Sequence, residues 1–342
     1  MSRDTREPQQ PTVACLGEML LRLSGPRDGR LFDSPALLAH FGGAEGNVAI
    51  ALAHLGLSSR FIGAAPDGAM GDAVAEHLMR HGVGVEGLRR APGRLGLYFL
   101  SPGAGVRPSS ILYDRADSVF ASSTASDFDW PALLCGAQWL HHSGITPALG
   151  ARSAELGLAA ARAARDLGLR ISFDGNYRAT LWERSGSDPV PTLRDYVAMA
   201  DLFIGNHRDI SLLLGRSFDG DGSDRRREAA EALFDAFPNL RHIASTARQT
   251  LNADSYSLSA RIDAPDGHYE SAAIPLDAVI DRIGTGDAFA AGVIAALDDG
   301  LEAAAETGLA LAALKHFTLG DASTSTRADV AAFRQGQFDV RR

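Results

Sequence analysis

A turn near the carboxyl end of the chain combines glycines with an acidic residue in a pattern that suits anion binding. It comprises Gly284, Thr285, Gly286 and Asp287, followed by the small residues of a helix. Glycines let backbone amides approach a ligand closely, and a helix start offers unpaired N–H groups and the positive end of the helix dipole. The turn therefore indicates a site for an anion or a developing negative charge. Asp287 has a plainer alternative, because Asp is also a favoured N-cap residue.

A second glycine pair opens a helix in the first part of the chain. Gly42 and Gly43 precede Asn47, which lies in the first turn of a helix whose apolar positions face a core. An amide side chain can donate to one hydroxyl and accept from another, which suits a polyol ligand. The alternative is an asparagine that only satisfies backbone groups at the helix start.

A third polar cluster follows a predicted strand that ends at Asp174. Asn176 and Arg178 come directly after it. Polar residues just past the carboxyl end of a parallel strand lie where open α/β sheets bind ligands. For Arg178 the alternative is an ordinary surface charge.

Overall composition limits the kind of partner. The chain has 342 residues, 45% of them apolar, with a net charge of -9. This acidic balance argues against nucleic acid or an anionic membrane as partner, since both attract clustered positive charge. No apolar run is long enough to span a bilayer, and residues 1–11 suggest a disordered tail without a signal peptide. A cytoplasmic protein that binds small molecules is expected, with Cys15 as a buried thiol.

Lysine usage excludes two phosphate-binding classes. Lys315 is the sole lysine of the chain. A P-loop requires a lysine after its glycines, and a protein-kinase site requires one on a strand, so neither can be assembled here.

The elements that must position these clusters alternate along the chain. Strand-like runs at 12–23, 60–63, 139–143, 169–174 and 202–206 alternate with helical stretches at 45–55, 71–81 and 151–167. Such alternation predicts an α/β fold with a mostly parallel sheet covered by helices on both faces. The segments at about 20–41 and 88–120 break the pattern with Gly, Pro, Arg and aromatic residues, and we interpret them as a small β lid inserted into a single domain spanning residues 12–342.

Taken in order, these clusters resemble the ribokinase-like (PfkB) carbohydrate kinases over about Val13 to Val330. The turn at 284–287 is similar to the Gly-Ala-Gly-Asp signature of that family. Among its members the chain is most similar to 2-dehydro-3-deoxygluconate (KDG) kinases, through the segments 42–47, 113–115, 143–145, 174–178 and 320–321. The resemblance implies a Rossmann-type three-layer sandwich with a β lid.

The resemblance also implies a reaction: transfer of the γ-phosphoryl group of MgATP to a primary hydroxyl of a sugar acid, giving KDG 6-phosphate. Asp287 would be the catalytic base, and the amides of Gly284, Thr285 and Gly286 would form an anion hole that needs no lysine. A requirement for a monovalent cation is left open. A homodimer through an exposed apolar lid is expected.

Further site residues follow from the same resemblance. A carboxylate substrate calls for arginine, and Arg115 beside Tyr113 and Arg178 beside Asn176 are the two candidates. Asp321 would reach a sugar hydroxyl, with a turn residue as the alternative. The predicted substrate-binding set is Gly42, Gly43, Asn47, Tyr98, Tyr113, Arg115, Asn176, Arg178 and Asp321.

The nucleotide side departs from the family pattern. Many relatives have a Gly-x-x-Gly turn where this chain has no glycine between Thr246 and Thr250. Thr246 and Arg248 are the expected replacements. Asn206 is predicted to contact ATP, and Asp209 could order magnesium-bound water, with no direct metal ligand assigned.

Two alternatives remain. The enzyme could phosphorylate another sugar, such as fructose or a nucleoside, or the chain could be a non-catalytic sugar-binding relative. The arginines separate the first alternative from a sugar-acid kinase, and the intact Asp287 turn argues against the second.

Overall fold

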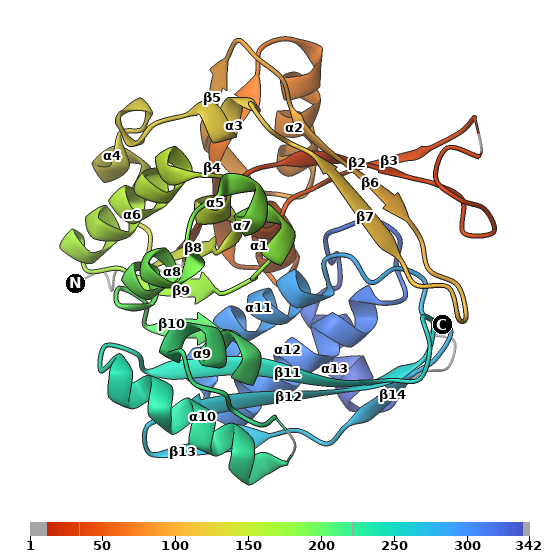
Figure 1. The fold of residues 1–342 in the computed structure, drawn as a ribbon, viewed down its shortest axis with the longest axis vertical. Coiled ribbons are helices and arrows are strands. Elements are labelled where there is room, and N and C mark those ends of the chain that lie inside the picture. The colour runs from red at the N-terminus through yellow and green to blue at the C-terminus, as the bar shows by residue number, and fades with distance from the viewer. Residues whose placement is uncertain (1–11, 34, 221, 338–342) are drawn as a thin grey trace, which may run out of the picture.

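The protein is described by a computed structural model over residues 12–33, 35–220 and 222–337. The tail expected at residues 1–11 lies outside the described residues. Figure 1 shows a large α/β body from which a long, narrow sheet projects to one side.

A ten-stranded sheet forms the centre of the body, with the order β13-β12-β11-β10-β9-β8-β1-β4-β5 and β14 paired to β12. Neighbours from β11 to β5 run parallel, and β12 pairs antiparallel with β11, β13 and β14. The strands are β1 (Thr12–Leu16), β4 (Ser58–Pro66), β5 (Gly84–Ala91), β8 (Trp139–Ser143), β9 (Arg170–Asp174), β10 (Leu202–Ile204), β11 (His242–Thr250), β12 (Tyr256–Ala264), β13 (Gly267–Glu270) and β14 (Ile274–Leu276). The predicted, mostly parallel sheet is confirmed.

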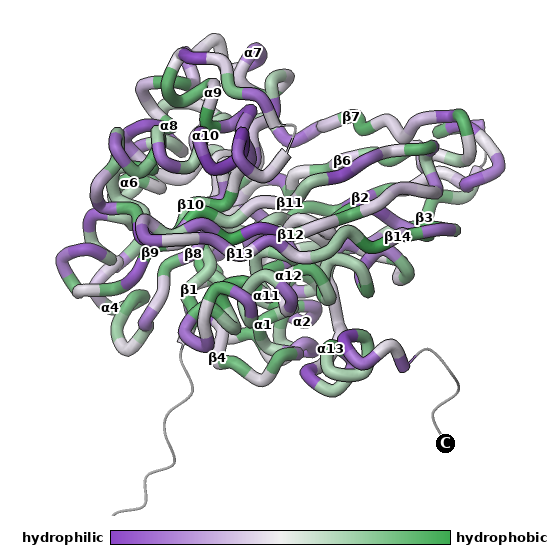
Figure 2. Tube along the Cα trace, turned by 90° about the horizontal axis from the view of Figure 1, so that it is seen from below, coloured by the Kyte–Doolittle hydropathy of each residue, from purple (hydrophilic) through white to green (hydrophobic). Residues whose placement is uncertain are grey.

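Helices cover both faces of this sheet, as expected for parallel strands. Figure 2 shows α6, α8, α9 and α10 on one side and α1, α2, α11, α12 and α13 on the other. Their bounds are α1 (Ala44–His54), α2 (Ala69–Arg80), α3 (Val119–Ser122), α4 (Trp130–Leu134), α5 (Ile145–Ala148), α6 (Ala151–Asp166), α7 (Ala179–Ser185), α8 (Pro189–Val197), α9 (His207–Leu214), α10 (Ser223–Ala236), α11 (Thr285–Ala296), α12 (Leu301–Lys315) and α13 (Arg327–Arg334).

The second, four-stranded sheet is the one that projects from the body in Figure 1. Its order is β3-β2-β6-β7, built from β2 (Leu20–Ser24), β3 (Leu38–Gly42), β6 (Gly96–Ser101) and β7 (Ser110–Asp114). We call it the lid sheet. Residues 88–91 belong instead to β5, at the edge of the large sheet.

The single strand expected over 12–23 was wrong, because the chain changes sheets there. Between β1 and β2, the Gly17 amide donates to the carbonyl oxygen of Ile62 over 3.0 Å. The carbonyl of Glu18 then passes close to Gly43, where an added Cβ would lie 2.1 Å from that oxygen. The lid sheet is therefore joined to the large sheet by a three-residue crossing.

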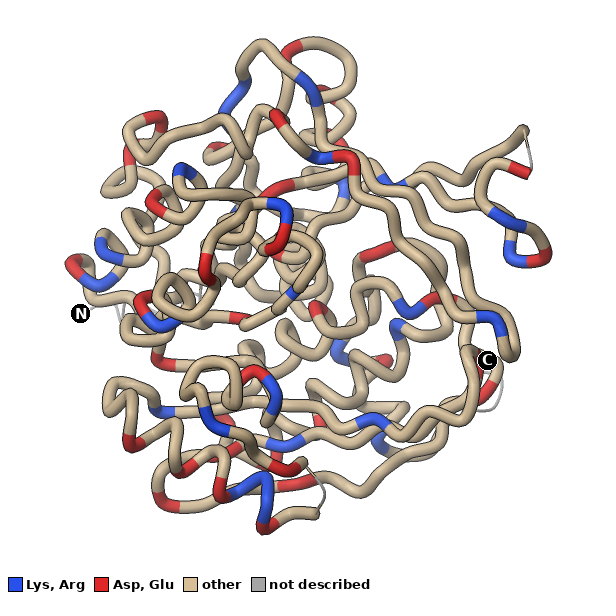
Figure 3. The backbone as a smooth tube through the Cα atoms, viewed as in Figure 1, with Lys and Arg blue, Asp and Glu red and all other residues tan. Residues whose placement is uncertain are grey.

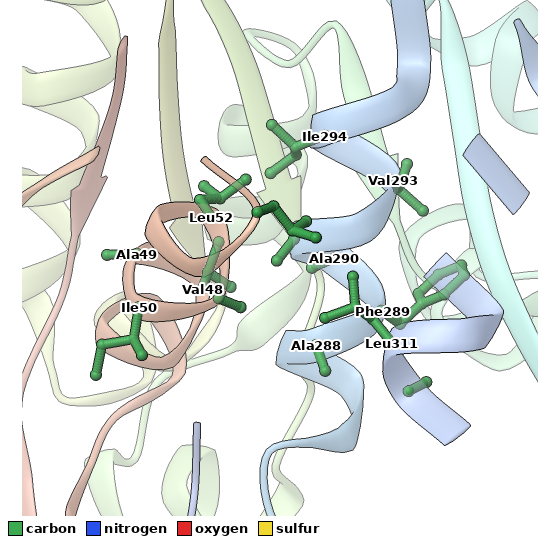
Figure 4. Close-up of a cluster of buried hydrophobic side chains, with 14 of the residues drawn as sticks. Val48, Ala49, Ile50, Leu52, Ala288, Phe289, Ala290, Val293, Ile294 and Leu311 are labelled. Atoms are coloured by element: carbon green, nitrogen blue, oxygen red, sulfur yellow. The ribbon is translucent and has the colours of Figure 1, made fainter. Parts of the chain in front are cut away.

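The core beneath the site is formed by α1 packed against α11. Val48, Leu52, Ala290 and Ile294 meet at this contact (Figure 4) and are almost fully buried. On the other side, α11 approaches α12 so closely that a Cβ at Gly292 would lie 2.7 Å from the Cα of Gly308. Close packing fixes the positions of both helix starts, and those starts carry Asn47 and Asp287. Cys15 is buried as a free thiol, as expected.

Candidate active site

A cavity of about 1490 Å³ lies between the lid sheet and the carboxyl ends of the parallel strands. Almost all of the predicted site residues line it, although they come from distant parts of the chain. They are Gly43, Asn47, Tyr98, Tyr113, Arg115, Asn176, Arg178, Asn206, Asp209, Thr246, Arg248, Gly284, Thr285, Gly286, Asp287 and Asp321. Gly42 is the predicted residue that does not line the cavity. It packs against Asp321, since a Cβ added at Gly42 would lie 1.9 Å from Oδ2 of Asp321.

Asp287 is not the N-cap of its helix. The N-cap of α11 is Gly284, which makes no side-chain capping bond, and Asp287 lies in the first turn. Its Oδ2 instead accepts a hydrogen bond of 2.7 Å from Nδ2 of Asn47, at the start of α1. Two helix starts thus converge on one carboxylate, a contact that the separate motifs did not predict.

The turn before Asp287 depends on glycine at position 284. Gly284 has φ 78°, and a Cβ there would lie 1.6 Å from the carbonyl oxygen of Asp321. Only glycine meets both conditions without strain. The first amides of α11 are left without intrahelical acceptors, as at any helix start, and can serve an anion.

Several carboxyl groups in the cavity have raised pKa values, among them Asp287, Glu45 and Asp174. Burial is the main cause for each, and it raises the pKa of Asp287 to about 6, of Glu45 to about 7 and of Asp174 to about 8. The charge of Asp287 raises the pKa of Glu45 and Asp174 further. The hydrogen bond from Asn47 and the charges of Arg178 and Lys315 act in the opposite direction on Asp287. Such groups suit proton transfer near neutral pH.

Glu45 is a residue that the motifs contained but did not single out. It is 1% exposed, and its Oε1 accepts a 2.6 Å hydrogen bond from Oγ of Ser143 at the end of β8. Gly17 makes room for it, since a Cβ there would lie 1.9 Å from the Glu45 carboxylate. The sequence did offer a signal for Glu45, because an acidic residue between Gly43 and Gly46 stands at the start of a helix.

The lid wall of the cavity contains a buried ionic network. Arg22 on β2 pairs with Asp281 at 2.7 Å and with Asp321 at 3.0 Å, and all three side chains are nearly inaccessible. The hydroxyl of Tyr98 on β6 donates to Oδ2 of Asp321. Tyr98 and Asp321 therefore bind each other as well as lining the cavity.

The two candidate arginines for a substrate carboxylate differ in their surroundings. Arg115 is buried and donates from Nε and Nη2 to Oε2 of Glu18, so its charge is largely offset. Arg178 is exposed, donates to the adjacent Tyr177 carbonyl oxygen, and has no ion-pair partner among the described residues. Glu18, which the sequence did not single out, is the difference between them.

Asn176 has an uncommon backbone and an unsatisfied side chain. Its φ is 39°, in the left-handed region that Asn tolerates better than most residues. Its Oδ1 is buried, and no donor within the described part of the chain reaches it. An unpaired buried acceptor is costly, so this atom is suited to a hydroxyl supplied by a ligand.

On the nucleotide side, Asn206 and Asp209 form a reciprocal cap on α9. Asn206 Oδ1 accepts from the Arg208 amide, and Asp209 Oδ2 accepts from the Asn206 amide, each over 2.8 Å. Both residues line the cavity, but these oxygens already serve the helix. The segment Thr246 to Thr250 continues β11 instead of turning.

No three His, Cys, Asp or Glu side chains among the described residues are grouped so as to hold a metal ion. Mg²⁺ commonly binds through one or two carboxylates together with substrate phosphates and water, so the carboxylates in the cavity fit a nucleotide-borne ion. In Figure 3, acidic and basic residues are interspersed around the molecule. Over the residues that the structure describes, every helix is too short or too polar to cross a membrane.

The chain is similar to known carbohydrate kinases. The family model described as pfkB family carbohydrate kinase matches residues 10–327. A 2-dehydro-3-deoxygalactonokinase of Haloferax volcanii is 31% identical over 326 residues, covering 95% of this chain and 96% of that protein. A 2-dehydro-3-deoxygluconokinase of Bacillus subtilis is 28% identical, covering 95% of each chain.

Among solved structures, the 2-dehydro-3-deoxygluconokinase of Thermotoga maritima superposes with a TM-score of 0.90 and 34% identity, covering 95% of this chain and 100% of that one. The fold is thus ribokinase-like, and the protein is a carbohydrate kinase. The chain belongs to the pfkB family, as its motifs predicted.

Proposed function

We propose that the protein transfers the γ-phosphoryl group of MgATP to a 2-dehydro-3-deoxy sugar acid, with 2-dehydro-3-deoxy-D-gluconate as substrate and its 6-phosphate as product. The observation that carries the proposal is the convergence of Asp287, Asn47 and the amides of α11 in a cavity that also contains Arg178 and Arg115. The names of the similar proteins from Bacillus subtilis and Thermotoga maritima support the same substrate class.

Asp287 is the proposed base. Its carboxylate accepts the proton of the sugar hydroxyl, and Asn47 holds it in place through the 2.7 Å hydrogen bond. The amides of Gly284, Thr285 and Gly286 stabilise the charge that develops on the transferred group. A bound magnesium ion would neutralise phosphate charge, with Asp209 as a residue that can order its water.

The sugar acid is proposed to lie between the lid sheet and the carboxyl ends of β8 and β9. Oδ1 of Asn176 lacks a donor among the described residues and can accept a sugar hydroxyl. Tyr98, Tyr113, Gly43 and Asp321 complete this wall, with Gly42 behind it. Arg178 is the freer of the two arginines for the carboxylate, and Arg115 contributes beside Glu18.

The C4 epimer is a second candidate substrate, since the similar protein from Haloferax volcanii is a 2-dehydro-3-deoxygalactonokinase. An ATP-consumption screen over both sugar acids, fructose, ribose and nucleosides tests the proposal. We expect kcat/KM for one of the two acids to exceed that for every neutral sugar. Faster turnover of fructose or a nucleoside would contradict it, and no turnover of any compound would favour a non-catalytic role.

Arg178→Lys tests the carboxylate contact within that screen. A lysine keeps the charge but loses the bidentate fork, so KM for the sugar acid is expected to rise about tenfold or more. KM for ATP should change much less. Arg216→Lys is the matched control, because Arg216 is an exposed arginine paired with Glu228.

A homodimer through the outer face of the lid sheet is also proposed. The register places Leu21, Leu23, Leu97, Phe99 and Leu112 on one face. Leu112 is 55% exposed, and Phe32, 61% exposed, packs on Phe99. A sheet face exposed to water usually carries polar residues, and this face is apolar. A second copy of the chain is therefore expected to cover it. Sedimentation of Leu112→Glu should show a monomer.

A further inference from the structure

Two arginines, Arg248 and Arg282, lie on the nucleotide side of the cavity. Arg248 extends from β11, and Arg282 lies in the segment before α11. Both line the cavity, and neither forms an ion pair with any residue in the described ranges. Arginines nearby behave differently, since Arg226 and Arg261 both pair with Glu270.

Both guanidinium groups lie against the ring of Tyr256 at the start of β12. The Cζ atom of Arg248 is 5.4 Å from the ring centroid, and that of Arg282 is 5.7 Å from it. Tyr256 is 2% exposed, and its buried hydroxyl has no hydrogen-bond partner in the part of the chain described. The tyrosine ring is therefore a fixed support that holds two positive groups near each other.

The aromatic ring that packs on Tyr256 beside this pair adds no negative charge. The His316 ring packs on Tyr256 with 5.2 Å between centroids, and burial lowers its pKa to about 4, so it is neutral near pH 7. Burial and the charge of Arg282 both lower the pKa of Arg248. Two like charges held together in this way gain from binding an anion with several negative oxygens.

The backbone of this region does not form an alternative phosphate site. β11 remains paired with β12 as far as Thr250, which lies opposite Tyr256. A straight strand cannot wrap successive amides around a phosphate as a glycine turn does. Side chains must supply the contacts that such a turn would make.

We propose that Arg248 and Arg282, supported on Tyr256, bind the phosphate chain of the nucleotide. The inference rests on the proposed function, because it takes ATP as the phosphoryl donor, and it adds Arg282 to the residues that the sequence suggested. The pair recognises the phosphates rather than the base or the sugar acid.

Thermal shift and calorimetric titration of the full chain with ATP, ADP and adenosine test the inference without any sugar. Arg248→Gln and Arg282→Gln should each weaken ATP and ADP binding about tenfold to a hundredfold and leave adenosine binding unchanged. Without nucleotide, the melting temperature should stay the same or rise, because a repulsive contact is removed. Arg216→Gln is the matched control, an arginine 4.5 Å from the ring of Phe218 but paired with Glu228.

Other results would overturn the inference. Variants that keep the wild-type ATP affinity would exclude phosphate binding by the pair while leaving the kinase assignment intact. A lower melting temperature without nucleotide, combined with equal losses for ATP and adenosine, would assign the arginines a structural role. Wild-type protein that does not bind ATP would overturn both this inference and the proposed function.

Discussion

Asp287 is the residue on which the proposed chemistry depends, and its substitution separates catalysis from folding. Asp287→Asn removes the proton acceptor but keeps an oxygen that can accept the hydrogen bond from Asn47. We expect kcat to fall by about 10²–10⁴-fold, the usual contribution of a general base. The melting temperature at pH 8 should be unchanged or higher, because a buried charge is lost. Steady-state kinetics that match the wild type would refute the assignment.

The pKa of Asp287 predicts how turnover depends on pH. Burial raises this pKa to about 6, and the carboxyl must be ionised to accept a proton, so kcat should fall as the pH drops through about 6. The hydrogen bond from Asn47 lowers the pKa, so Asn47→Ala should move this decline to higher pH. Ionisation of ATP could also produce a decline, but it would not move with the variant. A decline that stays in place in Asn47→Ala would therefore assign it to the substrate.

The raised pKa of Asp287 affects stability in the opposite direction: low pH lowers kcat but favours the folded state. The folded carboxyl binds its proton more tightly than the unfolded chain, whose value is near 3.8. Its contribution to stability is therefore complete below about pH 4 and declines as the pH rises through about 6. The site therefore holds an ionised base at neutral pH at a cost in folding free energy.

At the scale of elements, the ion pairs of Arg22 join the lid sheet to the loops beside α11 and α12. Arg22→Met should cost about 3–5 kcal/mol of unfolding free energy, because it leaves Asp281 and Asp321 buried without their partner. Urea unfolding measures this cost. Arg162→Met is the control: Arg162 pairs with Glu155, both are more than half exposed, and the loss should stay below about 1 kcal/mol. Equal losses in the two variants would contradict the buried network.

The sequence predicted most elements, and its failures have local causes. Residues 139–143 and 151–167 follow clear periodicities, and the structure has β8 and α6 there. The run at 12–23 is rich in apolar residues on both sides of Gly17, so its pattern did not mark the change of sheet. The extension of β11 to Thr250 depends on pairing with β12, a contact between segments that local patterns do not reveal.

The sequence predicted the site residues that stand in recognisable motifs. It did not predict which of these side chains contact one another in the fold. Asp287 and Asn47 stood in separate glycine motifs, and their direct contact required the packing of α1 on α11. Arg115 and Arg178 looked equivalent in the sequence, but only the fold places Glu18 beside Arg115. Arg282 lies two residues before the Gly284 turn, and its proposed role emerged only from its position over Tyr256.

Across the whole molecule, the far end of the lid sheet contacts the turn between β11 and β12. Arg27, in the loop after β2, pairs with Asp254. The Gly105 amide donates to Asp254 Oδ2 over 2.8 Å, and the Ala253 amide donates to the Gly105 carbonyl oxygen over 2.8 Å. These contacts join the lid, which borders the proposed sugar site, to the hairpin that carries Arg248. The cavity is thereby bridged at its outer end.

Asp254→Ala should release this bridge with little effect on global stability. The Arg27 and Asp254 side chains are 41% and 27% exposed, so their pairing contributes less than about 1 kcal/mol. Closure of such a lid excludes water and aligns both substrates, so we expect higher KM values for sugar and ATP together. Hydrogen exchange should rise at residues 103–107 and 252–254. Asp298→Ala, which breaks the exposed pair with Arg170, is the control. Unchanged exchange in these segments, with unchanged KM values, would show that the bridge does not hold the lid closed.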